Sequence, residues 1–277
     1  MRYCGRDFTE SEITIIRELI TTGVKRTPLS RLICEKFGWK NQADKLKAMS
    51  CRVAMLRMEK DGLIKLPPPQ QASGRYRRRV LPETDPAQLA SFSFTDVRLE
   101  LVDKKSSSLW NSFIDRYHYL GHQPLPGANL RYFAKVGDQI IALLGFGAAA
   151  WTTKPRDDFI GWSHPVREKN LHLIVNNARF LILPWISLKN LASRLLSMAA
   201  KRISEDWEFR YHYRPVLLET FVELPRFQGT CYKAANWIYV GVTKGRGKLE
   251  PTQQCKLPKK SIWLYPLNRN FKSTLVQ

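Results

Sequence analysis

Two neighbouring aspartates are the residues of this sequence that could support hydrolytic chemistry most directly. Asp157 and Asp158 follow Arg156 in the stretch KPRDDFIGW, which we expect to form a loop between strands. Paired carboxylates can hold Mg²⁺ for phosphodiester cleavage. More distant carboxylates that could join them are Glu205, Asp206, Glu219 and Glu223. An arginine-aspartate loop is more often a structural ion pair, which is the interpretation that we favour. A metal-dependent nuclease using Asp157 or Glu219 stays open as an alternative.

A carboxylate also interrupts a stretch that is typical of a strand. Alternation in RPVLLETFVEL predicts that Leu217, Glu219 and Phe221 share one face of a sheet. A carboxylate with such apolar neighbours must be paired or functional, because an isolated buried charge is costly. We therefore expect Glu219 to have a partner.

Three polar residues interrupt the apolar, β-branched stretch LHLIVNNARFLILP, which we expect to be a buried strand. They are Asn176, Asn177 and Arg179. Buried polar groups need hydrogen-bond partners. A cleft where neighbouring strands splay apart would supply them, and so would a β-bulge. The sequence favours neither over the other.

The histidines and cysteines give little support to a metal site. His118 and His122 are four residues apart, so a continuing helix would put both on one face. Gly121 is expected to end that helix, and no third ligand is evident nearby, so we expect no metal. The five cysteines form no Cys-x-x-Cys pair, which is typical of reduced thiols in a cytosolic protein: Cys4, Cys34, Cys51, Cys231 and Cys255.

The charge of the chain indicates a polyanionic partner. There are 45 lysines and arginines against 24 aspartates and glutamates, a formal net charge of +21. Such an excess favours nucleic acid or an anionic membrane surface. Apolar residues make up 44% of the 277 residues, which is enough for a sizeable core. No uncharged apolar run of about 18 residues suggests a membrane span, and the start MRYCGRDFTESEI lacks the apolar core of a signal peptide. We therefore expect a cytoplasmic protein that does not bind a membrane.

Two basic stretches could contact phosphates directly. RYRRR surrounds Tyr76 with arginines, which suits phosphate contacts and base stacking. GVTKGRGK has glycines on both sides of Arg246, so its backbone could approach a phosphate closely. A charged linker and a basic tail without a ligand are the alternatives. The residues expected to bind nucleic acid in these stretches are Arg75, Arg77, Arg78, Arg79, Lys244, Arg246 and Lys248.

Residues 9–66 are expected to be a compact helical unit. Thr9 and Glu12 have capping-box spacing before the first helix. Thr27-Pro28 predicts the start of a second helix, and DKLKAMSCRVAMLRMEKDG predicts a third. The strand-like GLIKLP then makes the order resemble a winged helix, whose last helix enters the major groove. Residues 1–66 hold 14 basic and 8 acidic residues. A small helical domain whose solvated face contacts protein is the alternative. The residues that the third helix would present to DNA are Lys45, Lys47, Arg52 and Arg57.

The chain as a whole is expected to be α+β with two domains. The winged-helix-like domain covers residues 1–66, a basic linker rich in Pro and Ser covers 67–95, and a mixed-sheet α/β domain covers 96–277. The expected elements of the larger domain are a strand, a helix, a hairpin, a central strand, a long helix, a strand, a short helix and further strands.

That order is similar to the acetyltransferase fold of the GNAT kind over residues 96–245. In those enzymes a glycine-rich turn brings the N-terminus of a helix close to the coenzyme A pyrophosphate. Here Leu188 and Asn190 occupy the places of the glycines, where a Cβ obstructs close contact. The resemblance also places Tyr232, in CYKAANW, at the position that often serves as general acid for a leaving thiolate. A half-buried aromatic residue on a short helix is the alternative.

The chain also resembles a narrower family, that of the Druantia anti-phage protein DruA. The stretches that carry the resemblance are GLIKLPPP, RDDFIGW, NNARFLILPWISLKNLAS, LLETFVE and GTCYKAANWIYVGVTKGRGK. Related modules occur in transposase-like proteins. The resemblance implies phage defence or a mobile-element setting, with nucleic acid as the ligand, and it assigns chemistry to no residue.

We therefore predict a component of an anti-phage system or mobile element that binds nucleic acid, expected to be double-stranded DNA, alongside other defence subunits. The alternatives are a coenzyme-A-dependent acyltransferase and a metal-dependent nuclease. No cofactor is expected, because neither the coenzyme A motif nor a Mg²⁺ motif is complete.

Overall fold

The computed structural model describes residues 1–68, 92–150, 152–245 and 257–277. The chain divides into two compact units, residues 1–79 and 80–277, and the division falls within the stretch predicted to be a linker. Among the described helices, none is both long enough and apolar enough to cross a membrane. Each unit has a core of its own and is described by itself.

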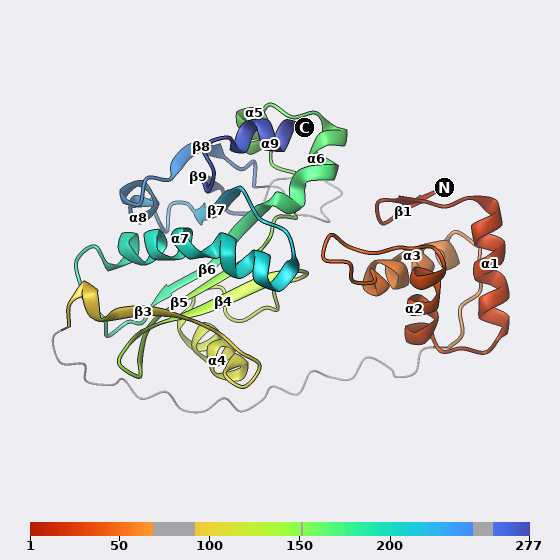
Figure 1. Ribbon diagram of the computed structural model, residues 1–277, viewed down its shortest axis with the longest axis horizontal. Coiled ribbons are helices and arrows are strands. Elements are labelled where there is room, and N and C mark those ends of the chain that lie inside the picture. Colours follow the sequence, from red (N-terminus) through yellow and green to blue (C-terminus); the bar gives the residue numbers. More distant parts are fainter. Residues whose placement is uncertain (69–91, 151, 246–256) are drawn as a thin grey trace. The chain divides into compact units, whose positions relative to one another are not determined.

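The first unit is helical, as the sequence predicts. Two short antiparallel strands precede three helices (Figure 1): β1 (Arg2–Tyr3), β2 (Arg6–Asp7), α1 (Glu10–Thr21), α2 (Arg26–Lys36) and α3 (Ala48–Lys60). The predicted capping box of α1 is present, because the Thr9 hydroxyl accepts from the Glu12 N–H and the Glu12 carboxylate accepts from the Thr9 N–H. The core of the unit is formed by one side of each helix, including Ile16, Ile33 and Met55.

The third helix begins later than the sequence predicts. Residues 40–46 form a turn closed by a bridge between Lys40 and Leu46, and Asp44 has a positive φ of 54°. The Asn41 side-chain oxygen accepts from the N–H groups of Ala43 and Lys45, an arrangement that competes with helix formation. Lys45 therefore lies in a turn. α2 also departs from the prediction, since it begins at Arg26 and is not capped by Thr27.

The strand-like ending predicted after α3 is not found in the described residues 61–68. Ile64 and Leu66 are buried in the core, and the Leu66 N–H donates to the Glu59 carboxylate. The hairpin that defines a winged helix is therefore not seen in that segment.

The second unit is built on a seven-stranded mixed sheet. Its strands, in chain order, are β3 (Val97–Leu101), β4 (Asn129–Val136), β5 (Gln139–Ala148), β6 (Ile174–Ile182), β7 (Leu217–Glu223), β8 (Ile238–Val242) and β9 (Lys260–Pro266). Their order in the sheet is β3-β4-β5-β6-β7-β9-β8, and β6–β7 is the parallel pair. The predicted α+β class with a mixed sheet is confirmed.

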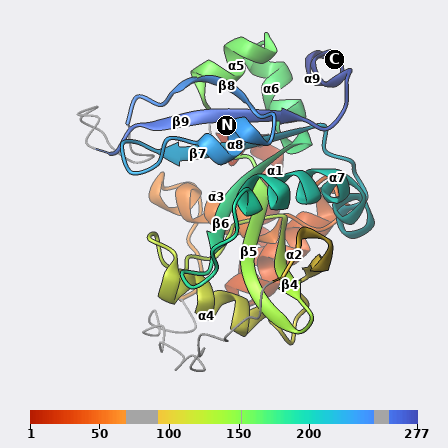
Figure 2. The same ribbon diagram turned by 90° about the vertical axis from the view of Figure 1, so that its left-hand side faces the viewer.

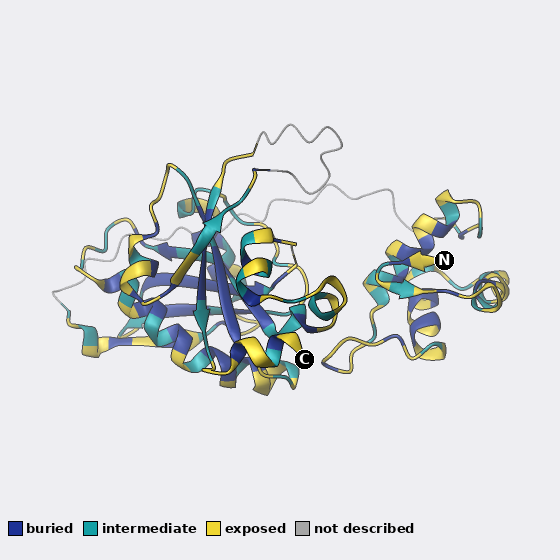
Figure 3. Ribbon diagram, turned by 90° about the horizontal axis from the view of Figure 1, so that it is seen from above, coloured by how far each residue is buried: buried dark blue, intermediate teal, exposed yellow. Residues whose placement is uncertain are grey.

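Helices cover both faces of this sheet. α7 (Leu191–Tyr211) packs on one face through Leu195, Ala199 and Ile203, which are four residues apart. On the other face, α4 (Ser107–Tyr117) lies against β4–β6. α5 (Lys154–Ile160), α6 (His164–Asn170) and α9 (Phe271–Val276) lie near β7 and β9 (Figures 1 and 2). The remaining elements are α8 (Thr230–Ala234) and two short 3₁₀ turns, Phe94–Asp96 and Leu171–Leu173. In Figure 3 the strands of this unit are the most deeply buried part.

The central pair of strands separates soon after it forms. β6 and β7 pair only over Ile174–Asn176 and Leu217–Glu219. Beyond Asn176, β6 continues with β5, and β7 continues with β9. The register of β6 against β5 also shifts there, leaving Ala178 as the extra residue of a β-bulge. Splayed strands and a β-bulge, the two alternatives that NNARF left open, are therefore both present.

Candidate functional site

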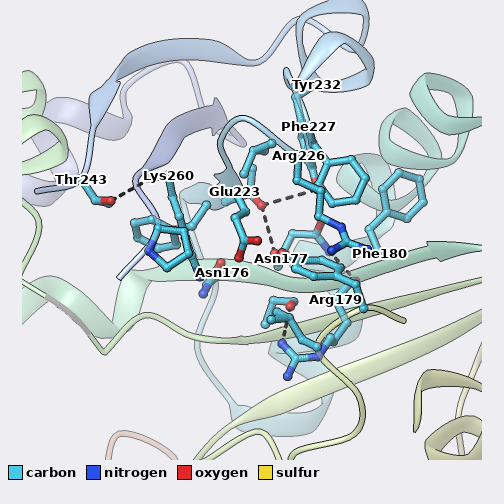
Figure 4. A pocket seen from close by; sticks show the side chains of 18 of the residues that line it. Asn176, Asn177, Arg179, Phe180, Glu223, Arg226, Phe227, Tyr232, Thr243 and Lys260 are labelled. Atoms are coloured by element: carbon cyan, nitrogen blue, oxygen red, sulfur yellow. Dashed lines mark hydrogen bonds between the residues drawn. The ribbon is translucent and has the colours of Figure 1, made fainter. Parts of the chain in front are cut away.

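A cleft of about 1120 Å³ lies where β6 and β7 separate. Its walls come from six parts of the second unit, and Figure 4 shows a close view. The segments that contribute residues are 117–126, 147–155, 176–182, 220–232, 242–245 and 257–260. The size is typical of a site for a small organic ligand or part of a larger one.

A buried network joins the two strands at the base of the cleft. The Tyr232 hydroxyl donates to the Asn177 side-chain oxygen at 2.8 Å, and the Thr220 hydroxyl donates to the Asn177 carbonyl at 3.1 Å. The Asn177 amide nitrogen donates to the carbonyls of Gly145 and Arg179. These bonds replace the ladder that the splay removes, so they hold the opening in one shape.

Tyr232, the predicted candidate for general acid, belongs to this network. Burial raises the pKa of its hydroxyl, and its proton is directed at Asn177. The side chain is 7% exposed. This arrangement fits a residue that positions the bulge. The side chain lies deeper than the half-buried aromatic residue of the alternative.

Two arginines of the cleft have no carboxylate partner among the described residues. One guanidinium nitrogen of Arg179 donates to the Ala178 carbonyl at 2.7 Å, while its Nε is buried without a hydrogen-bond partner. Arg226 is exposed and lies over the ring of Tyr119, with its Cζ 4.6 Å from the ring centroid. Lys244 and Lys260 line the same cleft. The carboxylate among the lining residues is that of Glu223.

The positive field of the cleft affects a neighbouring histidine. Burial, and to a lesser extent the charges of Arg179 and Arg226, lower the pKa of His118 to about 4. Its Nδ1 accepts from the Leu120 N–H, so the neutral ring carries its proton on Nε2. α4 ends at Tyr117, and His122 is therefore not on a shared helical face with His118.

Asp157 belongs to a buried cluster of ion pairs. Asp157 lies in α5 and not in the loop that the sequence suggested. Arg156, fully buried, contacts the carboxylates of Glu219 and Asp157, at 2.8 Å in each case. Arg167 approaches the other oxygen of Asp157 at 3.4 Å. Burial opposes the charge of Arg156, but Glu219 and Asp157 outweigh it and raise the pKa of the guanidinium.

The nuclease alternative gains no support from this cluster. Glu219 was expected to have a partner, and in the structure that partner is Arg156. Asp158 is paired with the exposed Lys154. No group of three or more His, Cys, Asp or Glu side chains is arranged to hold a metal within the part of the chain that the structure describes.

The turn before α7 does not fit the pyrophosphate of coenzyme A. The Leu188 side chain packs on the core, and Asn190 has a positive φ of 65°. The first N–H of α7, that of Leu191, already donates to the Leu188 carbonyl at 3.2 Å. Side chains thus stand where the resemblance requires glycines, and the backbone cannot approach a phosphate as closely.

In the first unit, α3 presents an exposed face without a carboxylate. Met49, Val53 and Leu56 are between 39% and 64% exposed. Arg57 and Lys60 lie on the same side by helical spacing and are exposed. Sequence analysis had missed Lys60 and the apolar residues, although their spacing alone could have indicated them.

The other predicted contacts of this helix divide into two groups. Lys45 and Lys47 are exposed just before α3, with Lys47 at its N-cap. Arg52 is half-buried, and it bonds the Thr27 hydroxyl and the Met49 sulfur. Arg52 is thus held within the unit. Six predicted residues lie outside the described ones: Arg75, Arg77, Arg78, Arg79, Arg246 and Lys248.

Comparison with known proteins identifies the family. The family model described as Druantia protein DruA matches residues 59–254. This chain belongs to the DruA family. Druantia is an anti-phage defence system, so family membership implies a role in defence. None of the curated proteins compared with this DruA-family chain matches it.

Solved structures similar to this DruA-family chain include acetyltransferases. A polyamine N-acetyltransferase of Drosophila melanogaster is 13% identical with a TM-score of 0.40, over 62% of this chain and 100% of the enzyme. A GNAT-family acetyltransferase of Streptococcus pneumoniae is 12% identical with a TM-score of 0.41, over 62% of this chain and 99% of the enzyme.

Proposed function

We propose that this DruA-family protein is a nucleic-acid-binding component of an anti-phage system, and that α3 and the turn before it bind double-stranded DNA. The observation that carries the proposal is the exposed face of α3, which combines cations with apolar side chains and has no carboxylate. We further propose that the protein acts in the cytoplasm, in keeping with the unpaired thiols of Cys34 and Cys51.

The chemistry of this face suits a DNA groove. Lys47, Arg57 and Lys60 supply charges for phosphates, which give most of the affinity and little sequence preference. Met49 and Val53 are apolar side chains of the kind that contact thymine methyl groups in the major groove. The opposite side of α3, with Cys51, Ala54, Met55 and Met58, is buried in the unit, which fixes the side that faces outward.

The charge of the second unit supports nucleic acid as the ligand in general. Residues 96–277 hold 27 basic and 14 acidic residues, an excess that favours a polyanion. A polyanion would reduce the mutual repulsion of the basic residues. Because of the misfit at Leu188 and Asn190, we do not extend the proposal to transfer of an acyl group from coenzyme A.

The test is the salt dependence of duplex binding. We expect the full chain to bind duplex DNA with an affinity that falls steeply as salt rises, by about 0.9 in the log–log slope for each phosphate contact. The double variant Arg57→Ala with Lys60→Ala should reduce that slope by about 2. The control is Lys104→Ala with Lys105→Ala, which removes two exposed cations elsewhere and should leave the slope unchanged.

Two results would count against the proposal. One is an affinity for duplex DNA that hardly changes between low and physiological salt. The other is an equal loss of slope in the α3 variant and in the control, because a general reduction of charge would then explain both.

A further inference from the structure

We infer that the cleft between β6 and β7 binds one unpaired nucleotide, with its base among the aromatic side chains and its phosphate against cations that have no carboxylate partner among the described residues. If the nucleotide belongs to a strand, the inference rests on the proposed nucleic-acid binding. The chemistry of the cleft itself is independent of α3.

Aromatic side chains from separate segments meet in the cleft. The rings of Tyr119 and Phe227 are 5.4 Å apart in an edge-to-face arrangement, and the Arg226 guanidinium lies over the Tyr119 ring. Phe180 and Tyr232 form a second pair at 6.5 Å on the β6 side (Figure 4). Phe227 is 46% exposed, so part of its ring is open to a ligand. Unpaired bases stack on rings and guanidinium planes of this kind.

The cations of the cleft call for a negatively charged group. Arg179 has a buried Nε with no partner, and burial lowers the pKa of its guanidinium, so its charge is poorly compensated in the described structure. Arg226 is not paired with a described carboxylate. Lys260 lies on the opposite side of the cleft (Figure 4), and Lys244 also lines the cleft. A phosphate would supply the missing acceptors, and a planar arginine can bind it through two nitrogens.

Two acceptors in the same cleft suit the edge of a base. The Asn176 side-chain oxygen is buried and has no donor among the described residues. Glu223 is half-buried, and its carboxylate points into the same space (Figure 4). Acceptors of this kind bind amino and imino groups. We therefore expect the cleft to prefer bases that carry an amino group over thymine, which has a single imino donor.

The size of the cleft selects an unpaired nucleotide. About 1120 Å³ accommodates one nucleotide with its phosphate, and a base still paired and stacked in a duplex presents neither ring face. The ligand is therefore a free nucleoside phosphate, or a nucleotide at an end, gap or flipped position of a strand.

The experiment uses 2-aminopurine, a fluorescent base that is quenched when it stacks, in the single-stranded overhang of a short duplex. We expect the full chain to quench the overhang probe. Phe227→Ala and Arg226→Ala should each weaken binding of this probe about tenfold while leaving binding of the blunt duplex unchanged. Arg226→Lys, which keeps the charge and loses the planar group, should recover only part of the loss. The matched controls are Phe209→Ala, an exposed ring on α7, and Lys201→Ala, an exposed cation on the same helix.

A second arm identifies the source of the nucleotide. If 2-aminopurine deoxyribonucleoside monophosphate competes with the overhang and depends on Phe227, the cleft takes free nucleotides. If the overhang alone is quenched, the nucleotide comes from a strand. Quenching that is the same in the wild type, Phe227→Ala and Arg226→Ala overturns the inference, and so does competition by coenzyme A but not by the nucleotide.

The two proposals can fail separately. If the wild type does not bind the blunt duplex, and quenching of the probe still depends on Phe227, the role of α3 is contradicted and nucleotide binding in the cleft is supported. Duplex binding that depends on Arg57 and Lys60, with no effect of the cleft variants on the probe, supports α3 and contradicts the cleft.

Discussion

Two arginines of the second unit, Arg156 and Arg179, differ in what surrounds their charge. Arg156 is fully buried and has two carboxylates within 2.8 Å. Arg179 is half-buried, has no carboxylate partner in the described structure, and keeps one buried nitrogen unbonded. A compensated charge of the first kind holds elements together. An uncompensated charge of the second kind costs stability, and it suits a site whose negative charge comes from a ligand.

The sharpest way to break this comparison is to remove the partner of Arg156. Glu219→Gln keeps the shape of the side chain but leaves a buried guanidinium with Asp157 as its remaining carboxylate. We expect a loss of about 3 kcal/mol in the free energy of unfolding, measured by denaturant titration. The double variant Arg156→Met with Glu219→Leu should recover most of it, because both charges are then absent. If the single variant is as stable as the wild type, Glu219 does not compensate Arg156.

The network under the cleft should be the next most sensitive. Tyr232→Phe removes the donor to the buried Asn177 oxygen and should lower the free energy of unfolding by about 1–2 kcal/mol. Tyr239→Phe is the control, since Tyr239 is 52% exposed and packs edge-to-face on Trp263. An equal effect of the two substitutions would show that the hydroxyl of Tyr232 has no special role.

Acid should weaken the fold through His118. Its pKa is about 4 in the folded protein, below the ordinary 6.5, because burial, Arg179 and Arg226 disfavour the charged ring. The unfolded chain therefore binds the extra proton between those values, and stability falls as the pH is lowered. Allowing for its partial exposure, we expect His118 to contribute about 1 kcal/mol of loss between pH 7 and pH 5. His118→Gln should reduce the pH slope and leave the part due to His122 and His172, whose pKa values burial also lowers. A slope unchanged by the substitution would contradict this.

The smallest effect is expected at Arg179, with the opposite sign to that at Glu219. Arg179→Met removes an uncompensated charge and should raise the free energy of unfolding by about 0.5 kcal/mol. The same variant should lose affinity for the overhang probe. Lys201→Met, an exposed cation on α7, is the control and should change neither quantity. A destabilisation as large as that of Glu219→Gln would mean that Arg179 is structural too.

Periodicity and charge in the sequence predicted most of the fold and part of the site. The apolar run predicted the strand at Ile174–Ile182. The polar residues within that run predicted its splay or β-bulge, because buried polar residues need partners. The predicted start of α3 was wrong because Asn41 and Asp44 form a local turn, which the spacing of hydrophobic residues does not reveal. The pairing of Arg156 with Glu219 joins residues 63 positions apart, and no local pattern contains that distance.

The cleft residues Tyr119, Arg226 and Phe227 were missed for a similar reason. Each lies just beyond a regular element, where patterns of helix and strand end. A signal was present, since aromatic and basic residues are direct neighbours at both places, in RYHY and PRF. What the sequence lacked was the topology that brings the two places to one opening.

In the described sheet, β6 and β7 pair as neighbouring strands at three positions, between Ile174–Asn176 and Leu217–Glu219, and side chains join them beyond that point. The middle of the sheet is therefore the place where the fewest backbone hydrogen bonds join neighbouring strands. A ligand in the cleft would contact both β6 and β7 and would restrict their motion relative to each other. Slower amide hydrogen exchange in residues 178–182 and 220–223 would then report occupancy even where the overall shape does not change.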